Sequence, residues 1–164
     1  MIELRETQES DIKFIEACLK DKDEDFLEQC GYGRRFFEFP VTYNQILRFQ
    51  KEIHPDSLFF TITKANISLG SFELMLNPDA KKSTVARLLI ADNCRNMGYG
   101  TEALLKSIEY TFNILNYDKI GLSVYDFNKS ALRCYEKAGF KIIDTAIRPN
   151  GWMAINMEIN NPAL

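Results

Sequence analysis

The sequence predicts an α/β protein with a mixed central sheet of about seven strands flanked by about four helices. Residues 58–63 and 67–76 are rich in Phe, Ile and Thr and are separated by a short turn, which predicts a β-hairpin. Residues 85–91 form a nearly continuous apolar strand, and a polar loop with two glycines leads from it into an amphipathic helix over about 101–116. A hairpin followed by a strand–loop–helix unit indicates one sheet with helices packed against it.

The other elements follow from apolar periodicity and helix caps. Thr42 and Gln45 form a capping-box pair that predicts the start of a helix, and Asn128 and Gly139 predict the two ends of another. Because no repeat or linker interrupts the chain, we expect a single domain over residues 1–164. The expected order is β-α-α-β-β-β-α-β-α-β-β, with the remaining strands at residues 2–4, 119–125, 140–145 and 152–159.

Size and charge exclude several classes of protein. A chain of 164 residues with 46% apolar residues has enough apolar material for one core. Its net charge of −3 gives no basic footprint for a nucleic acid. No apolar run is long enough for a membrane span, and the first residues do not resemble a signal peptide, so we expect a cytoplasmic protein without nucleic-acid or membrane partners.

Cysteine and histidine usage argues against metal or thiol chemistry. Cys18, Cys30, Cys94 and Cys134 lie far apart and match neither a close pair of metal ligands nor a redox pair. We therefore expect reduced cysteines and no metal site. The single histidine, His54, precedes a proline in a connecting segment, and we do not expect a nucleophile system built around it.

The loop over residues 95–101, Arg-Asn-Met-Gly-Tyr-Gly-Thr, is the first candidate site. Gly98 and Gly100 leave the backbone bare just before a helix, where N–H groups and the helix dipole bind phosphate. Arg95 either contacts the same anion or shapes the loop. Two other interpretations stay open: glycines that serve only the turn, and a dinucleotide fingerprint completed by Ala103 and Asp118, which the intervening residues 92–97 disfavour.

The helix after residue 125 carries the second candidate. Asn128, Ala131 and Tyr135 are spaced i, i+3 and i+7 and share one stripe. Taken alone, this stripe is a cap, a small packing residue and a half-buried aromatic ring.

Together, the Arg-x-x-Gly-x-Gly loop and the later segment Asn128…Ala131…Tyr135-Glu-Lys-Ala-Gly-Phe resemble the two signature motifs of GNAT acyltransferases. The resemblance covers nearly the whole chain. Within the family, the chain is similar to the branch that includes ribosomal-protein N-terminal acetyltransferases. It implies the GNAT fold, in which a splayed strand opens a slot for the cofactor, and an N-acetyltransferase that uses acetyl-CoA (coenzyme A) as acyl donor.

The resemblance also implies roles for individual residues. Backbone amides of the glycine loop would hold the pyrophosphate, and strand 88–91 would pair with the pantetheine arm. The N–H of Ile90 or of a neighbour would face the thioester carbonyl, and Tyr135 would reach the sulfur. Asp92 departs from the family, since many relatives have proline there. The expected cofactor contacts are Leu89, Ile90, Ala91, Arg95, Asn96, Met97, Gly98, Tyr99, Gly100, Thr101, Asn128, Ala131 and Tyr135.

Direct attack on a thioester through a tetrahedral intermediate needs an acid and a base. An alkylamine is protonated near neutrality and must lose a proton, while the departing thiolate must gain one. Tyr135 is the candidate acid. Glu73, mid-strand between two apolar residues, is the first candidate for the base because the strand period points it away from them, toward the expected slot. The alternative for Glu73 is an exposed or cross-strand-paired carboxylate without a catalytic role. Asp126 is the reserve candidate.

Other interpretations of function and acceptor stay open. A non-catalytic acyl-CoA-binding sensor of the same fold and a structural partner domain are the alternatives to an enzyme. The acceptor is a small-molecule amine or a peptide N-terminus, which the acidic residues 21–28 could attract, and the aromatic and basic residues 31–37 could line its entrance. An exposed strand such as 152–159 could pair two subunits as a homodimer.

Overall fold

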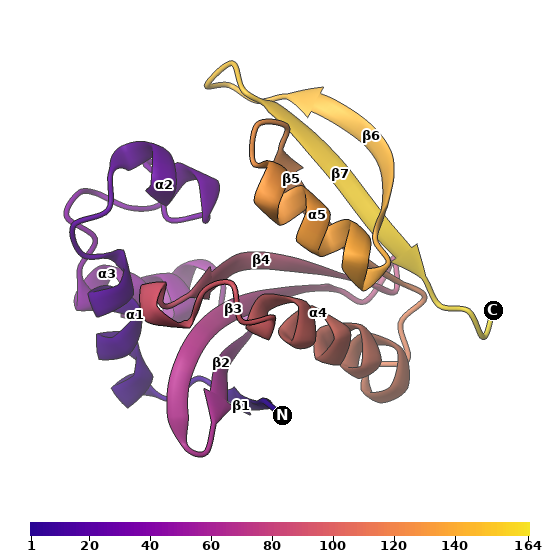
Figure 1. Ribbon diagram of the computed structural model, residues 1–164, viewed down its shortest axis with the longest axis horizontal. Coiled ribbons are helices and arrows are strands. Elements are labelled where there is room, and N and C mark those ends of the chain that lie inside the picture. The colour runs from indigo at the N-terminus through magenta and orange to yellow at the C-terminus, as the bar shows by residue number, and fades with distance from the viewer. The chain divides into compact units, whose positions relative to one another are not determined.

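The computed structural model describes residues 1–164 and contains a seven-stranded sheet with the strand order β1-β2-β3-β4-β5-β7-β6 (Figure 1). The predicted α/β class and mixed sheet are confirmed, with five α-helices in place of about four. The strands are β1 (Glu3–Glu6), β2 (Leu58–Lys64), β3 (Ile67–Asn77), β4 (Lys82–Ile90), β5 (Lys119–Tyr125), β6 (Lys141–Ile147) and β7 (Met153–Asn160). The α-helices are α1 (Ile12–Leu19), α2 (Glu24–Gln29), α3 (Tyr43–Arg48), α4 (Tyr99–Glu109) and α5 (Lys129–Ala138), with short turns η1 (Glu9–Asp11), η2 (Phe49–Ile53), η3 (Asp92–Cys94) and η4 (Tyr110–Ile114).

The chain forms two compact units, and β3 and β4 contribute residues to both. The first unit contains residues 1–75 and 86–99, and the second contains residues 76–85 and 100–164. In the first unit, β1, β2 and β3 pair in antiparallel fashion. The predicted hairpin is confirmed: Ala65 and Asn66 join its strands with φ of 49° and 64°, the left-handed pair that a tight hairpin turn requires.

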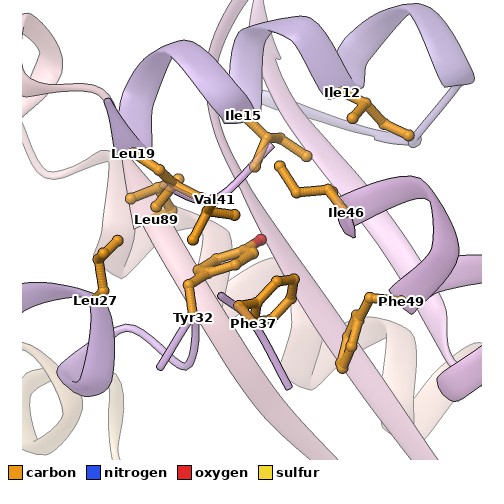
Figure 2. Close-up of a cluster of buried hydrophobic side chains, with 10 residues drawn as sticks. All are labelled: Ile12, Ile15, Leu19, Leu27, Tyr32, Phe37, Val41, Ile46, Phe49 and Leu89. Carbon is orange, nitrogen blue, oxygen red and sulfur yellow. The ribbon is translucent and has the colours of Figure 1, made fainter. Parts of the chain in front are cut away.

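Helices α1, α2 and α3 bury one apolar core in the first unit. Figure 2 shows the rings of Tyr32, Phe37 and Phe49 among aliphatic side chains, and adjacent ring centroids lie 5.1 Å apart. Tyr32 and Phe37 are only 4% and 3% exposed, so the prediction that residues 31–37 line an entrance is wrong for these two rings. The ten core residues are Ile12, Ile15, Leu19, Leu27, Tyr32, Phe37, Val41, Ile46, Phe49 and Leu89.

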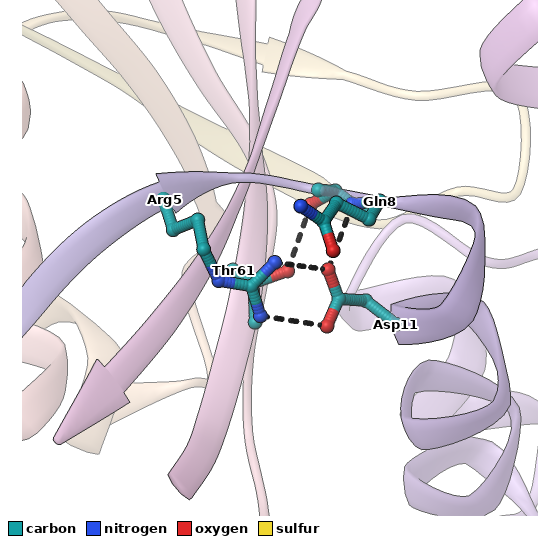
Figure 3. A network of polar contacts seen from close by, with 5 residues as sticks. Arg5, Gln8, Asp11 and Thr61 are labelled. Atoms are coloured by element: carbon teal, nitrogen blue, oxygen red, sulfur yellow. Dashed lines mark hydrogen bonds and ion pairs between the residues drawn. The ribbon is translucent and has the colours of Figure 1, made fainter. Parts of the chain in front are cut away.

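An ion pair fixes the start of the first helix against β1 (Figure 3). Arg5 donates from both terminal nitrogens to the Asp11 carboxylate at 2.8 Å, and the Gln8 N–H donates to the same carboxylate at 2.7 Å. Burial acts to raise the pKa of Asp11, but the Arg5 and Gln8 hydrogen bonds and the Arg5 charge outweigh it, so the pKa lies below its usual value.

The acidic segment 21–28 includes α2, a helix that the sequence pattern does not predict. Asp23 caps this helix by accepting from the Phe26 N–H at 2.8 Å, and Glu24 pairs with Arg34. At α3, Thr42 accepts from the Gln45 N–H as predicted, but the Gln45 side chain bonds Glu38 and Pro40 instead of completing the capping box.

In the second unit, β7 lies between β5 and β6 and pairs with both in antiparallel fashion. The first residues of β4 pair in parallel with β5, over Lys82–Thr84 and Lys119–Gly121. Because β7 is an interior strand, the prediction that it is free to pair two subunits is wrong; the strand at this end of the sheet is β6.

Helix α4 ends at Glu109, where η4 continues the turn to Ile114, while α5 begins at the predicted Asn128 cap and ends at Gly139 with φ of 105°. None of the helices combines the length and the apolar character that spanning a membrane requires.

Candidate active site

The glycine loop follows β4 in the first unit and leads into α4. Gly98 has φ of +82°, a conformation that favours glycine, and a Cβ added there would meet no atom within 4 Å. Met97 is 61% exposed, and Asn96 also has a positive φ of 61°. The loop therefore presents bare, exposed backbone next to Tyr99, the first residue of α4, as an anion site at a helix N-terminus requires.

Arg95 shapes this loop. Its Nε donates to the Ile90 carbonyl at 3.3 Å, and its terminal nitrogen lies 3.2 Å from the Asp92 carboxylate. Asp92 also pairs with Lys22, and the hydrogen bond from Lys22 is the main cause that lowers the pKa of Asp92. Lys22 and Arg95 both lie over the ring of Phe26, at 5.2 and 5.0 Å. Asp92, in the position where many GNAT enzymes have proline, thus joins the loop to α2 through two basic side chains.

At the end of β4, backbone N–H groups point alternately toward β3 and away from it. The Ala91 N–H donates to the Leu69 carbonyl at 2.9 Å, so the N–H of Ile90 points away from β3 by the alternation of an antiparallel pair. The Ile90 carbonyl, which accepts from Arg95, lies on the same side of the strand as the Ile90 N–H. At Gly70, a Cβ would lie 2.3 Å from the Leu89 carbonyl, so glycine permits the close approach of β3 and β4.

Glu73 lies in the middle of β3, as predicted, but its surroundings differ from the expectation. The side chain is fully buried, and Arg87 of β4 donates to Oε2 at 2.6 Å. Ser57 donates to Oε1 at 2.7 Å, and the Nδ1 of His54 contacts the same oxygen. The carboxylate therefore faces three protein groups instead of an open slot.

Arg87 occupies an irregular point of β4. Its φ of 54° is positive inside a strand, and its guanidinium lies over the rings of Phe49 and Phe36 at 4.4 and 5.5 Å. Its buried Nε has no hydrogen-bond partner. Sequence reasoning missed Arg87 and set His54 aside, because they lie 14 and 19 positions from Glu73 and form no local motif with it.

The second unit contains the other predicted residues. Asn128 caps α5 by accepting from the Ala131 N–H at 3.2 Å. Thr101, in the first turns of α4, lies 3.2 Å from the Sγ of Cys134, which joins this helix to α5 beside Tyr135. Burial, followed by the neighbouring Cys134, raises the pKa of Tyr135 above its usual value, so its phenol is held in the protonated form that a general acid needs.

An aromatic cluster, which the sequence did not indicate, borders Asp126. Tyr125 and Phe127 stack with centroids 5.8 Å apart, and Trp152 meets them edge-on at 4.9 and 5.0 Å. The Asp126 N–H donates to the Met153 carbonyl at 3.0 Å, which fixes the end of β5 against β7.

The four cysteines are free. Burial raises the pKa of Cys18 to about 11 and that of Cys30 to about 12, so neither thiol is an activated nucleophile. The chain contains no group of three or more His, Cys, Asp or Glu side chains arranged to hold a metal ion.

The predicted cofactor contacts therefore fall into two sets. Residues 89–99 lie in the first unit, and Gly100, Thr101, Asn128, Ala131 and Tyr135 lie in the second.

Comparison with known proteins identifies the fold of this chain. A spermidine N-acetyltransferase from Vibrio cholerae in complex with CoA and spermine superposes with a TM-score of 0.80 and 21% identity, over 97% of this chain and 95% of that chain. A chimera of that enzyme, SpeG, with hSSAT gives a TM-score of 0.80 and 22% identity over the same shares. At this level of identity the similarity shows a shared fold.

A curated sequence relative is the SPbeta prophage-derived uncharacterized N-acetyltransferase YokL of Bacillus subtilis (strain 168). It is 25% identical over 104 residues, which cover 62% of this chain and 59% of the relative, so the match spans less than two thirds of the relative's length. The acetyltransferase (GNAT) domain matches residues 2–141. The chain therefore belongs to the acetyltransferase (GNAT) domain family.

Proposed function

We propose that this protein is an acetyl-CoA-dependent N-acetyltransferase that transfers an acetyl group to a primary amine, with residues 1–164 as one catalytic domain. The proposal rests on the loop before α4, where Gly98 has a left-handed backbone conformation and no other atom lies within 4 Å of the position of a Cβ. A phosphate needs this combination to approach backbone N–H groups. Family membership and the predicted motif residues support the same activity.

The loop amides of Met97, Gly98, Gly100 and Thr101 would hold the pyrophosphate of CoA. Arg95 acts on this site indirectly, since its side chain is engaged by Ile90 and Asp92 and holds the loop in shape. Leu89, Ala91, Asn96, Tyr99, Asn128 and Ala131 complete the proposed cofactor contacts.

The proposed chemistry is direct acyl transfer. Acetyl-CoA, when bound, supplies an activated acyl carbon, and the N–H of Ile90 stabilises the negative charge that develops on the carbonyl oxygen in the tetrahedral intermediate. Tyr135 is the proposed donor of a phenolic proton to the departing sulfur. The sequence pattern favours Glu73 as the acceptor of the amine's proton, with Asp126 in reserve. However, the Glu73 carboxylate is fully buried and engaged by Arg87, Ser57 and His54, so its proposed role is exerted through this network.

A small cationic amine is the acceptor that the comparisons favour, since the similar structures are spermidine N-acetyltransferases. A peptide N-terminus, as in the ribosomal-protein branch, is the second candidate. Within the acidic segment, Glu24 is already paired with Arg34. The segment over residues 21–28 therefore offers a cation less charge than its sequence indicates.

The cytoplasmic location and the homodimer remain predictions. If a dimer forms through the sheet, the edge strands β1 and β6 are the ones available for pairing, since β7 is already paired on both sides. Edge pairing of this kind joins identical strands across a twofold axis.

The test measures acetyl-CoA-dependent thiol release with spermidine, spermine, simple alkylamines and short peptides, together with calorimetric CoA binding. Tyr135→Phe should lower kcat by about 10²- to 10⁴-fold, because it removes the general acid, while CoA still binds. Tyr43→Phe is the matched control, since its hydroxyl only contacts Glu9 on the surface, and it should keep full activity.

Three results would redirect the proposal. CoA binding without turnover on any acceptor would favour the acyl-CoA sensor. Absence of CoA binding would refute the proposal. Turnover with peptides but not polyamines would place the enzyme with the N-terminal acetyltransferases.

A further inference from the structure

The only histidine of the chain is bonded to its most deeply buried carboxylate. His54 follows η2, and its Nδ1 contacts Oε1 of Glu73, which Ser57 also contacts at 2.7 Å. An ionised carboxylate only accepts hydrogen bonds, so Nδ1 must be the donor, and in the neutral ring Nε2 then carries the lone pair. This arrangement leaves the imidazole with one basic nitrogen directed away from the carboxylate.

Several contacts fix the ring in this orientation. The ring centroid of His54 lies 4.4 Å from that of Phe49 and 5.4 Å from that of Phe36. On the far oxygen of Glu73, Arg87 donates at 2.6 Å and holds the carboxylate in place. The ring is thus positioned by aromatic packing on its faces and by a buried carboxylate at one nitrogen.

Exposure distinguishes the two members of the pair. The Glu73 side chain is 0% exposed, whereas the His54 side chain is 21% exposed. Part of the His54 side chain can therefore be contacted by a molecule in solution, whereas the Glu73 carboxylate cannot. A carboxylate that holds one ring nitrogen while the other nitrogen is left to act on a substrate is the arrangement of the carboxylate–histidine pair in a serine hydrolase.

The pair is connected to the strand that is proposed to hold the acyl donor. Arg87 comes directly before Leu88, so one hydrogen-bonded chain runs from β4 through Glu73 of β3 to His54.

We propose that His54 is the general base of the acetyl transfer and that Glu73 is its positioning residue. This inference rests on the proposed function. The acceptor ammonium gives one proton to Nε2 of His54, and the freed lone pair forms the C–N bond to the thioester carbon. The C–S bond then breaks, its electron pair stays on sulfur as thiolate, and Tyr135 protonates that sulfur. As the intermediate collapses, the nitrogen loses its second proton to the Tyr135 phenolate, and the imidazolium of His54 releases its proton to water. The net reaction is therefore ammonium plus thioester to amide, thiol and one proton.

The experiment uses two substitutions of His54 in the full chain. His54→Asn keeps an N–H donor near the position of Nδ1 for Glu73 but has no basic nitrogen, so it separates the hydrogen bond from the base. His54→Ala leaves room for added imidazole. Both should bind CoA as wild type does and lose about 10²- to 10⁴-fold in kcat/KM with the best acceptor of the panel.

Rescue distinguishes a base from a structural residue. Added imidazole should restore part of the His54→Ala activity in a concentration-dependent way and should leave Tyr135→Phe unchanged. Near-wild-type kcat/KM in His54→Asn would overturn the inference. Loss of activity in a folded, CoA-binding His54→Ala that imidazole does not rescue would overturn it as well, and would assign His54 a structural role. Absence of turnover in wild type would refute the proposed function itself, which separates the two failures.

Discussion

Replacing Gly98 by alanine separates backbone strain from cofactor binding. Because a Cβ at this position meets no atom within 4 Å, the substitution carries no steric cost inside the protein. The remaining cost is the left-handed φ of +82°, about 1–2 kcal/mol for a residue with a side chain, which corresponds to a melting temperature lower by roughly 2–8 °C. CoA binding should suffer more, since the methyl group occupies the space of the phosphate. Loss of one charge-assisted hydrogen bond, about 1.5–3 kcal/mol, predicts a Kd raised by roughly 10- to 150-fold.

The chain offers a matched control for this strain. Gly151, in the connection between β6 and β7, has φ of +84° and likewise no atom within 4 Å of an added Cβ. Gly151→Ala should therefore lower the melting temperature by a similar amount and leave the Kd for CoA unchanged. Calorimetric titration of both variants and a thermal melt of each provide the comparison. Equal CoA affinities for Gly98→Ala and Gly151→Ala would refute the assignment of the loop as a phosphate site.

Two further predictions concern charges inside the first unit. Glu73→Gln and Arg87→Met should each lower the free energy of unfolding by about 3 kcal/mol or more, because each leaves a buried partner uncompensated. The double variant should lose clearly less than the sum of the two single losses. Additive losses in urea unfolding would contradict a buried ion pair. Asp11→Asn should cost about 1 kcal/mol at neutral pH, since the Arg5 side of the pair is 40% exposed. The folded pKa of Asp11 is lowered, so its contribution is present above the unfolded pKa of about 3.9 and is lost as pH falls through the folded value. Wild type should therefore lose more stability than Asp11→Asn below about pH 4, and parallel stability–pH curves would contradict this.

Elements with a clear apolar pattern can be predicted from the sequence, and elements without one cannot. The hairpin of β2 and β3 is predictable because each strand is rich in β-formers and the turn between them is short. Helix α2 escapes prediction because its six residues are mostly acidic and show no apolar periodicity. The expectation that Tyr32 and Phe37 line an entrance fails, since a sequence does not reveal whether an aromatic residue in an irregular segment packs inward.

The same limit applies to the candidate site. The glycine loop is contiguous in the chain, so the sequence alone is enough to name its residues together. Glu73 can be chosen from the strand period, but its partners cannot, because His54 and Arg87 approach it only after β2, β3 and β4 align. The sequence pattern therefore identifies a carboxylate and misses the imidazole that is its more exposed neighbour.

Arg87 shows why the irregular point of β4 belongs to the site. Other non-glycine residues with positive φ, such as Ala65 and Asn66, lie in turns, where such a conformation is common, whereas Arg87 lies within a strand. A left-handed conformation there is unfavourable and needs compensation. The ion pair with Glu73 and the stacking on Phe49 supply it. Because the residues that follow Arg87 are those proposed to face the thioester, the contacts that hold this irregularity also set the direction of the N–H groups beyond it. Mutations of the Glu73 network should therefore alter catalysis through β4 as well as through His54.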